Sequence, residues 1–188
     1  MLIAALSSLL EPDPYTRKLK EMSTFVDIRP ATEQDVPIIL DFIKKLAEYE
    51  KLLHEVVATE DVLRESLFGE RRYAEVIIAY GKKAEDSAEE PAGMALFFHN
   101  FSTFLGRPGL YLEDLFVNPE FRGCGIGKKL LTQLAAIAKE RSCARYEWVC
   151  LDWNEPSRKF YEALGAKPQS EWIIHRVEGK SLDDLAAL

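Results

Sequence analysis

The fold is decided by the stretch Arg122-Gly123-Cys124-Gly125-Ile126-Gly127, which places three alternate glycines between a strand-like run and a helix-like run. Residues 110–117 before it are rich in apolar and aromatic side chains, as in a strand. Behind it, apolar residues recur at the spacing of one helix face: Ile126, Leu130, Leu131, Leu134, Ile137 and Ala138. Glycines at such a junction let backbone N–H groups approach an anion at the positive end of a helix. The stretch therefore predicts a strand, a loop and a helix that together bind an oxyanion.

Spacing excludes two common phosphate-binding loops. A P-loop that ends at Gly127-Lys128 would need glycine at position 122 and serine or threonine at 129, but the chain has Arg122 and Lys129. A dinucleotide fingerprint that begins at Gly123 would need glycine where Lys128 stands. A glycine-rich turn that only lets the strand and helix pack together stays open as an alternative.

The rest of the chain predicts strands alternating with amphipathic helices. Strands are expected over residues 25–29, 73–80, 91–101, 110–117, 145–151 and 172–177. Helices are expected from about residue 31 to 50, over 59–67 with Thr59 as N-cap, from the glycine stretch onward, after Asn154, and over 181–188. Residues 106–109 contain a strong turn signal, Gly-Arg-Pro-Gly. This order predicts an α/β (α+β) fold, with a mixed sheet covered by helices.

Composition limits the classes of protein and partner. With 188 residues and 47% hydrophobic content, the chain can bury a core as one domain without disulfides. The 24 basic and 31 acidic residues argue against a nucleic-acid surface and favour a cationic partner. Three cysteines at 124, 143 and 150 lack the spacing of a zinc or redox motif, so a reducing compartment is expected.

The N-terminal segment carries no expected function. Met22-Ser23-Thr24 precedes the first strand, so residues 1–21 are expected to be a flexible extension and residues 22–188 a single domain. No apolar run approaches the ~20 residues that span a bilayer, and residues 2–10 lack the basic start of an export signal. We therefore expect a cytoplasmic protein with no membrane partner.

Longer motifs resemble a known family. Residues 110–117, Asn118-Pro119-Glu120-Phe121 and the glycine stretch resemble the cofactor-binding core of the GNAT N-acetyltransferases. Tyr111-Leu112-Glu113-Asp114, Leu151-Asp152-Trp153-Asn154 and residues 160–166 resemble the diamine acetyltransferases and their thialysine-acetylating relatives. The similarity covers residues 25–177 or so. It implies the GNAT fold, with a mixed central sheet of six to seven strands flanked by helices, and acetyl-CoA as cosubstrate.

The resemblance also assigns cofactor contacts. Backbone amides of the strand after Glu113 would contact the acetyl carbonyl and pantetheine, and loop amides would bind the pyrophosphate. A second contact would come from the start of the helix at Asn154. The implied set is Leu115, Phe116, Val117, Arg122, Gly123, Cys124, Gly125, Ile126, Gly127, Lys128, Asn154, Glu155, Pro156 and Ser157.

Acetyl transfer to an amine first needs a neutral nucleophile. A lysine-like ammonium with pKa about 10.4 is neutral about once in 10³ molecules at pH 7, so a group must accept its proton. By resemblance Glu113 accepts it, directly or through water, and attracts the cation. Asp114 is expected on the opposite face of the strand, as a structural residue or second substrate contact, because strand side chains alternate. Tyr161 matches the family's general acid. A solvated acidic pair and a core aromatic residue stay open as alternatives.

Substrate contacts are implied at five further positions. Tyr49 and Glu50 match substrate-side residues of the diamine acetyltransferases, and Trp148, Val149 and Cys150 match the substrate-lining strand. Residues 101–104, Phe-Ser-Thr-Phe, lack the acid and the tryptophan of the spermidine and spermine enzymes. This departure favours a shorter amine, as in the thialysine-acetylating branch.

The resulting prediction is an acetyl-CoA-dependent N-acetyltransferase. It would acetylate a primary amine of a small cationic substrate, such as thialysine, a lysine-like amine, a diamine or a polyamine, by direct attack in a ternary complex. A non-catalytic CoA-binding sensor or scaffold and a protein lysine or N-terminal acetyltransferase are the alternatives. His54, His99 and His175 lie on separate elements, so no metal is expected. The resemblance further implies a homodimer.

Overall fold

A computed structural model describes residues 26–83 and 86–188 of the chain. These fall into two compact units, which meet between Val149 and Cys150 in the sequence. The expected extension over residues 1–21, and Phe25 at the start of the first predicted strand, lie outside the described residues. The expectation of one domain over residues 22–188 stays a prediction.

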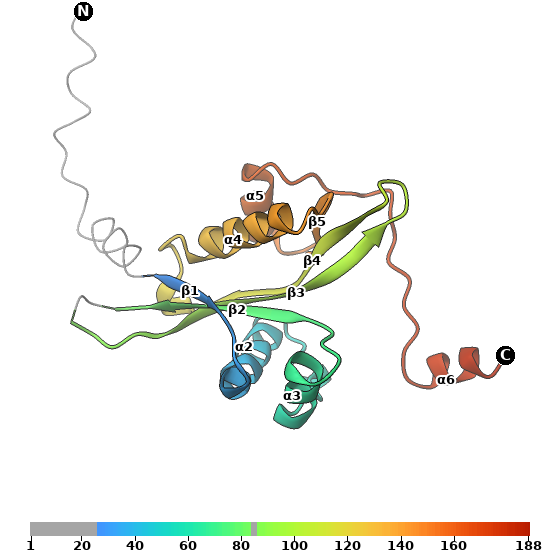
Figure 1. Cartoon of the computed structure of the whole chain (residues 1–188), viewed down its shortest axis with the longest axis horizontal. Coiled ribbons are helices and arrows are strands. Elements are labelled where there is room, and N and C mark those ends of the chain that lie inside the picture. The colour runs from blue at the N-terminus through green and yellow to red at the C-terminus, as the bar shows by residue number, and fades with distance from the viewer. Residues whose placement is uncertain (1–25, 84–85) are drawn as a thin grey trace, which may run out of the picture. The chain divides into compact units, whose positions relative to one another are not determined.

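The first unit contains a mixed sheet of five strands in sequence order (Figure 1). The strands are β1 (Asp27–Pro30), β2 (Glu75–Gly81), β3 (Glu90–Ser102), β4 (Arg107–Val117) and β5 (Arg145–Trp148). Neighbours from β1 to β4 are antiparallel, whereas β4 and β5 are parallel. The predicted mixed sheet flanked by helices is confirmed, but it has five strands instead of six to seven.

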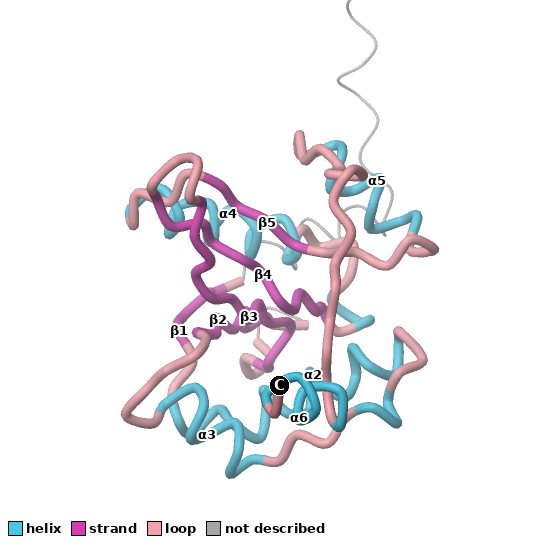
Figure 2. The backbone as a smooth tube through the Cα atoms, turned by 90° about the vertical axis from the view of Figure 1, so that its right-hand side faces the viewer, coloured by secondary structure: helices cyan, strands magenta, loops and turns pink. Residues whose placement is uncertain are grey.

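Helices cover both faces of this sheet. The helices α2 (Val36–Tyr49) and α3 (Glu60–Phe68) lie on one face and α4 (Ile126–Glu140) on the other (Figures 1 and 2). The face toward α2 and α3 is a buried cluster of alternate strand residues and helix residues: Ile39, Phe42, Leu67, Val76, Ile78, Met94, Leu96 and Phe116. The predicted N-cap is confirmed, because the Thr59 side chain accepts a hydrogen bond from the Val62 amide over 3.3 Å.

The predicted turn at residues 106–109 is displaced. The hairpin turns at residues 103–106, with Gly106 at φ 62°, and Arg107 already begins β4. Gly109 lies inside that strand, where an added Cβ would stand 2.2 Å from Oδ1 of Asn100 and 2.9 Å from Arg145. Close packing against the neighbouring strands therefore requires Gly109. Gly109 thus belongs to the strand and not to the predicted turn.

A β-bulge interrupts β4 at Glu113. Leu96 of β3 pairs with Asp114, but the next residue, Phe97, pairs with Leu112, so Glu113 is the extra residue of the bulge and has no partner in β3. Directly paired residues share a face of the sheet. Because Leu96 belongs to the cluster under α2 and Phe97 faces the other way, Asp114 and Leu112 point to opposite faces. Strict alternation therefore fails between Leu112 and Asp114, and the expected opposite facing of Glu113 and Asp114 stays a prediction.

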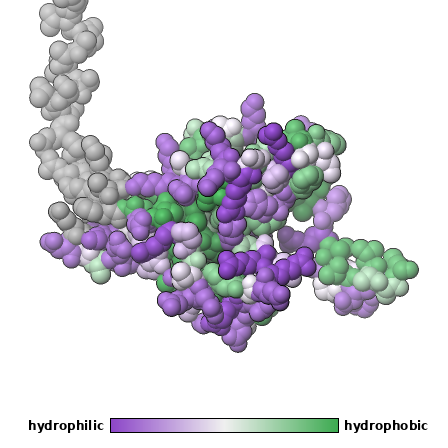
Figure 3. Space-filling model, viewed as in Figure 1, coloured by the Kyte–Doolittle hydropathy of each residue, from purple (hydrophilic) through white to green (hydrophobic). Residues whose placement is uncertain are grey.

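The second unit contains two helices, α5 (Glu155–Ala163) and α6 (Lys180–Ala186). Asn154 caps α5 as predicted, since its side chain accepts from the Ser157 amide over 3.3 Å, and Gly165 at φ 90° follows its end. The predicted terminal helix is confirmed as α6. Figure 3 shows its apolar surface, to which the exposed Leu182 and Leu185 belong.

Residues 172–177 form no strand, contrary to the prediction. They have no strand partner among the described residues, and the side chains of Trp172 and Ile173 are 74% and 78% exposed. Aromatic and β-branched residues favour a strand only where a neighbouring strand receives them. Likewise β5 ends at Trp148 rather than at Leu151.

Candidate functional site

The glycine loop is built for something other than packing. Gly123 and Gly125 have φ of 79° and 78°, which only glycine adopts without strain. A Cβ on Gly127 would meet a single atom, Cγ2 of Val117, at 3.9 Å, and one on Gly125 would meet nothing within 4 Å. Close approach of the strand to the helix therefore does not explain Gly127. The open space at Gly125 and Gly127 is compatible with an approaching ligand, and the alternative of a packing turn stays open.

The loop ends at the positive end of α4. The first amides of this helix, at Ile126, Gly127 and Lys128, have no acceptor within the helix, as at every helix N-terminus. Cys124 is buried beside them, and burial raises the pKa of its thiol. A protonated, buried thiol is inert, so Cys124 serves to pack the loop.

Two buried side chains hold the start of the loop. Nδ2 of Asn118 donates to the carbonyl oxygen of Pro91 over 2.8 Å, and the Asn118 amide donates to the Ala92 carbonyl. The ring of Phe121 is buried so close to β2 that a Cβ on Gly81 would lie 3.0 Å from it. The loop is therefore anchored to β2 and β3 before any ligand arrives.

Strand β4 has an open edge just before this loop. β5 pairs with β4 only over residues 109–112, where Leu112 opposes Trp148. From residue 113 to 117 that edge has no strand partner within residues 26–83 and 86–188. The predicted cofactor contacts Leu115, Phe116 and Val117 lie in this open stretch. Free backbone groups along a strand edge can hydrogen-bond an extended ligand.

Carboxylates gather at the bulge. Burial, and after it the nearby carboxylates of Glu113 and Glu50, together raise the pKa of Asp114 to about 6. Burial also raises the pKa of Glu50, at the end of α2. Glu113 itself is exposed. Three acidic groups from α2 and β4 thus influence one region, which favours a cation there. The position of Asp114 toward α2 is not evident from the local sequence, because the bulge depends on the register of β4 with β3.

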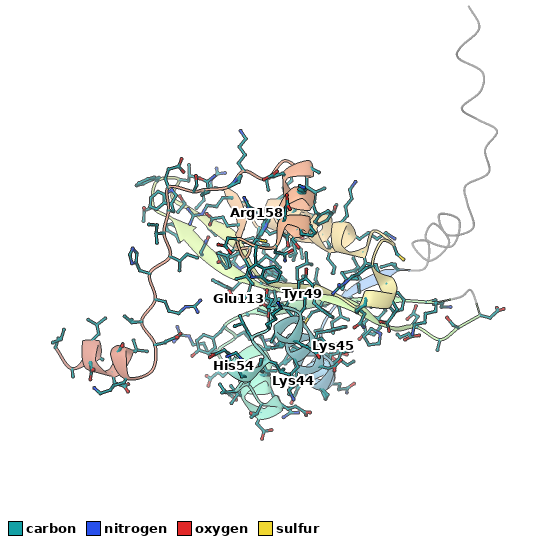
Figure 4. All side chains as sticks on the ribbon, turned by 180° about the vertical axis from the view of Figure 1, so that it is seen from behind. Lys44, Lys45, Tyr49, His54, Glu113 and Arg158 are labelled. Atoms are coloured by element: carbon teal, nitrogen blue, oxygen red, sulfur yellow. The ribbon has the colours of Figure 1, made fainter. Side chains whose placement is uncertain are left out.

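The end of α2 reaches the same loop. The guanidinium of Arg122 lies 5.3 Å from the ring centroid of Tyr49 and 5.8 Å from that of Phe116. One turn earlier, Nζ of Lys45 lies 3.4 Å from Oδ1 of Asn118. Figure 4 labels Lys45 and Tyr49 on α2 and Glu113 on β4. The structure therefore brings the predicted substrate-side residue Tyr49 against a predicted cofactor residue, a contact that no local sequence signal announces.

The remaining predicted residues lie at the end of β5 and in the second unit. Trp148 ends β5 with its ring 4.9 Å from that of Tyr146, and Val149 and Cys150 follow outside the strand. In the second unit, Asn154 is buried as the cap of α5, which carries Glu155, Pro156 and Ser157 in its first turn. Tyr161 lies further along α5, with its ring 5.6 Å from that of Phe160. Arg158, labelled in Figure 4, donates to the carbonyl oxygen of Asp152 over 2.9 Å.

Neither a metal cluster nor a membrane helix is found in the described ranges. Across residues 26–83 and 86–188, no three His, Cys, Asp or Glu side chains are grouped so that they could hold a metal ion. Within the same ranges, no helix combines the length and apolar character needed to cross a membrane.

Comparison with known proteins decides the family. Residues 43–166 match the model of the acetyltransferase (GNAT) family. The chain belongs to the GNAT acetyltransferase family. This GNAT protein is 39% identical to the thialysine N-epsilon-acetyltransferase of Bos taurus over 167 residues, which cover 86% of the chain and 98% of that protein. It is 32% identical to the L-ornithine N5-acetyltransferase of Arabidopsis thaliana, over 87% of the chain and 89% of that protein.

A solved structure supports the fold of this GNAT protein. An integron cassette protein from Vibrio cholerae matches with a TM-score of 0.70 and 28% identity, over 86% of the chain and 97% of its own. The predicted resemblance to GNAT acetyltransferases and their thialysine-acetylating branch is confirmed. Since the relatives are named as acetyltransferases, the GNAT protein is an acetyltransferase enzyme.

Proposed function

We propose that this enzyme transfers an acetyl group from acetyl-CoA to a side-chain amine of a small cationic molecule by direct attack in a ternary complex. Thialysine and lysine-like amines are the favoured acceptors, and diamines and polyamines come second. The observation that carries the proposal is the bulge in β4, which puts the Glu113 and Asp114 carboxylates beside an open strand edge leading into the glycine loop. The names of the relatives support it, because thialysine and ornithine both carry a side-chain amine.

Acetyl-CoA would be held by backbone more than by side chains. The amides of residues 123–128 would bind the pyrophosphate oxygens at the positive end of α4, and the bare Cα of Gly127 leaves room for them. Backbone groups of Leu115, Phe116 and Val117 would hold the acetyl and pantetheine end, through those of their amides that point away from β3 to the open edge of β4. The resemblance to the family also suggests Asn154 to Ser157, at the start of α5, as a second contact. When bound, acetyl-CoA provides the acetyl group already activated as a thioester.

Glu113 and its neighbours would prepare the amine. A carboxylate in contact with the ammonium accepts its proton and offsets part of a deprotonation cost of about 4 kcal/mol at pH 7. Asp114 and Glu50 add negative charge that attracts the cation. Tyr161 then donates a proton to the leaving sulfur, since a phenol with a reference pKa of about 10 is protonated at pH 7.

An amine panel tests the reaction. The purified protein is incubated with acetyl-CoA and thialysine, lysine, putrescine, spermidine or spermine, and the release of free thiol is followed. We expect the fastest release with thialysine or lysine. No release with any of the five amines contradicts the proposal and leaves a CoA-binding sensor or an acetyltransferase of protein amines.

A paired substitution tests the general acid. Tyr161→Phe should lower the rate by about 10²- to 10⁴-fold, because the hydroxyl that donates the proton is removed while the ring is kept. Tyr73→Phe is the matched control, because it removes the hydroxyl of an exposed tyrosine whose ring packs on Arg71. Equal turnover of the two variants removes Tyr161 from the mechanism.

Assembly as a homodimer in the cytoplasm completes the proposal. The second unit exposes several large apolar side chains that a second copy of the chain would bury in a dimer. They are Trp172, Ile173, Ile174, Val177, Leu182 and Leu185. Light scattering at micromolar concentration should give twice the mass of 21.4 kDa. Replacing Trp172 and Ile174 by serine should shift the mass toward the monomer; a wild-type monomer contradicts this part.

A further inference from the structure

The connection between β4 and α4 is held from outside by α2. The guanidinium of Arg122 lies 5.3 Å from the ring centroid of Tyr49 and 5.8 Å from that of Phe116, and its Nε donates to the carbonyl oxygen of Val117 over 3.0 Å. The side chain of Arg122 is thus folded back over the end of β4. Lys45 contacts Asn118, the other end of the same connection, at 3.4 Å.

Arg122 stands where the anchored part of the loop ends. Asn118 and Phe121 before it are buried, whereas Gly123 after it has φ of 79° and is exposed. A glycine in this region has a wide choice of backbone conformations. The position of the Arg122 side chain therefore restricts the direction in which the chain enters the glycine segment.

We propose that Tyr49 is a positioning residue for the cofactor loop, whose ring holds Arg122 so that residues 123–128 are presented in their binding conformation. This inference rests on the proposed function, which places the cofactor pyrophosphate at that loop. Sequence resemblance put Tyr49 on the substrate side. The two roles differ in a measurable way, because a positioning residue changes the affinity for the cofactor and a substrate contact changes the affinity for the amine.

The expected size of the effect follows from the kind of contact. Tyr49 is 40% exposed and Arg122 is exposed, so the attraction of the guanidinium to the ring is that of a solvated pair. Such pairs change an equilibrium constant by about two- to five-fold. The ring of Phe116 keeps part of the hold on Arg122 when Tyr49 is replaced, so the loss stays in this range.

Calorimetric titration with CoA tests the inference on the full chain. Tyr49→Leu removes the ring and keeps a good helix former, and should weaken CoA binding by about two- to five-fold. Tyr49→Phe keeps the ring and should bind as the wild type does. Tyr73→Leu is the matched control, since it removes a ring at 5.1 Å from Arg71 at another place on the first unit. Thermal unfolding of each variant confirms that it is folded, and Tyr49→Gln replaces Tyr49→Leu if the latter is not.

Steady-state kinetics separate the two roles of Tyr49. In Tyr49→Leu the KM for acetyl-CoA should rise by about two- to five-fold while the KM for thialysine changes less. In a double variant with Arg122→Gln, Tyr49→Leu should weaken CoA binding no further, because the ring acts through Arg122.

Each result has a separate meaning. Wild-type protein that binds no CoA overturns the proposed function and this inference with it. If the wild-type protein and Tyr49→Leu bind CoA equally tightly, the inference alone is overturned. If only the KM for thialysine rises in Tyr49→Leu, the inference is wrong and Tyr49 is a substrate contact. If the losses of CoA affinity from Tyr49→Leu and Arg122→Gln add up fully in the double variant, the inference is wrong as well.

Discussion

The two halves of strand β4 differ although they belong to one strand. Residues 107–112 are paired with β3 along one edge and over residues 109–112 with β5 along the other, and the side chains of Leu110 and Leu112 are 0% and 2% exposed. Residues 113–117 lose β5 as a neighbour and begin with two carboxylates, of which Asp114 has its pKa raised to about 6 by burial and nearby acids. The bulge at Glu113 separates them. Both halves contribute to the core, the second through Phe116, but only the second half offers open backbone and charge.

The largest expected effect is on chemistry in the second half. Glu113→Gln keeps the size of an exposed side chain but cannot accept the proton of the amine. The rate should fall by about 10²- to 10⁴-fold, equivalent to about 3–5 kcal/mol in the barrier, while the melting temperature stays the same. Steady-state rates with thialysine measure the effect. Glu89→Gln, on an exposed acid that pairs with Arg29, is the control, and equal rates for both variants would falsify the role of Glu113.

The first half should respond in stability instead. Leu112→Ala empties a buried site and should cost about 2–5 kcal/mol in the free energy of unfolding. Val117→Ala, at a half-buried position in the second half, should cost about 1 kcal/mol. Urea unfolding of both variants gives the two losses. If they are equal, the two halves do not differ in their support of the core.

Asp114→Asn should raise the free energy of unfolding, whereas most substitutions in a strand lower it. Because the folded-state pKa of Asp114 is raised from 3.8 to about 6, the protonated form is favoured on folding. Its contribution to stability is therefore complete below about pH 4 and is lost as the pH rises through 6. Asparagine avoids that loss, so the variant should be more stable by about 1–3 kcal/mol at pH 8 and equal to the wild type near pH 4. Urea unfolding at pH 4, 6 and 8 checks this; a difference that is independent of pH argues against it.

The smallest effect on stability is expected from a substitution in the glycine loop, which follows the second half of β4. Gly127→Ala adds a methyl group that meets only Val117 at 3.9 Å, and alanine favours the helix by at most ~1 kcal/mol. The melting temperature should stay or rise slightly, while CoA binding weakens because the methyl group occupies the space left for the pyrophosphate. Thermal unfolding and calorimetric titration measure both. Unchanged CoA affinity would mean that the bare Cα has no part in binding.

Local signals predicted much of this structure from the sequence. The strand, glycine loop and helix from residue 110 to 140 follow from hydrophobic periodicity and glycine chemistry, and the caps Thr59 and Asn154 from their side chains. Each of these depends on residues within a few positions of one another.

Features that depend on a partner distant in sequence could not be predicted. The bulge at Glu113 exists only in the register with β3, and the place of Gly109 depends on Asn100 and Arg145. Residues 172–177 have the composition of a strand but no strand beside them in the described part of the chain. The contact between Tyr49 and Arg122 joins α2 to the loop, and periodicity within either element carries no trace of it.

Hydrogen exchange of the backbone amides, with and without CoA, tests most directly the claim that the second half of β4 and the glycine loop form the cofactor site. CoA should slow exchange at residues 123–128 and at those of residues 115–117 whose amides point away from β3, because the open edge and the free amides of α4 gain acceptors. Residues 109–112, already paired on both sides, should exchange at the same rate in both states. Slowing at residues 109–112 without slowing at 115–117 and 123–128, or no change anywhere, would contradict the account.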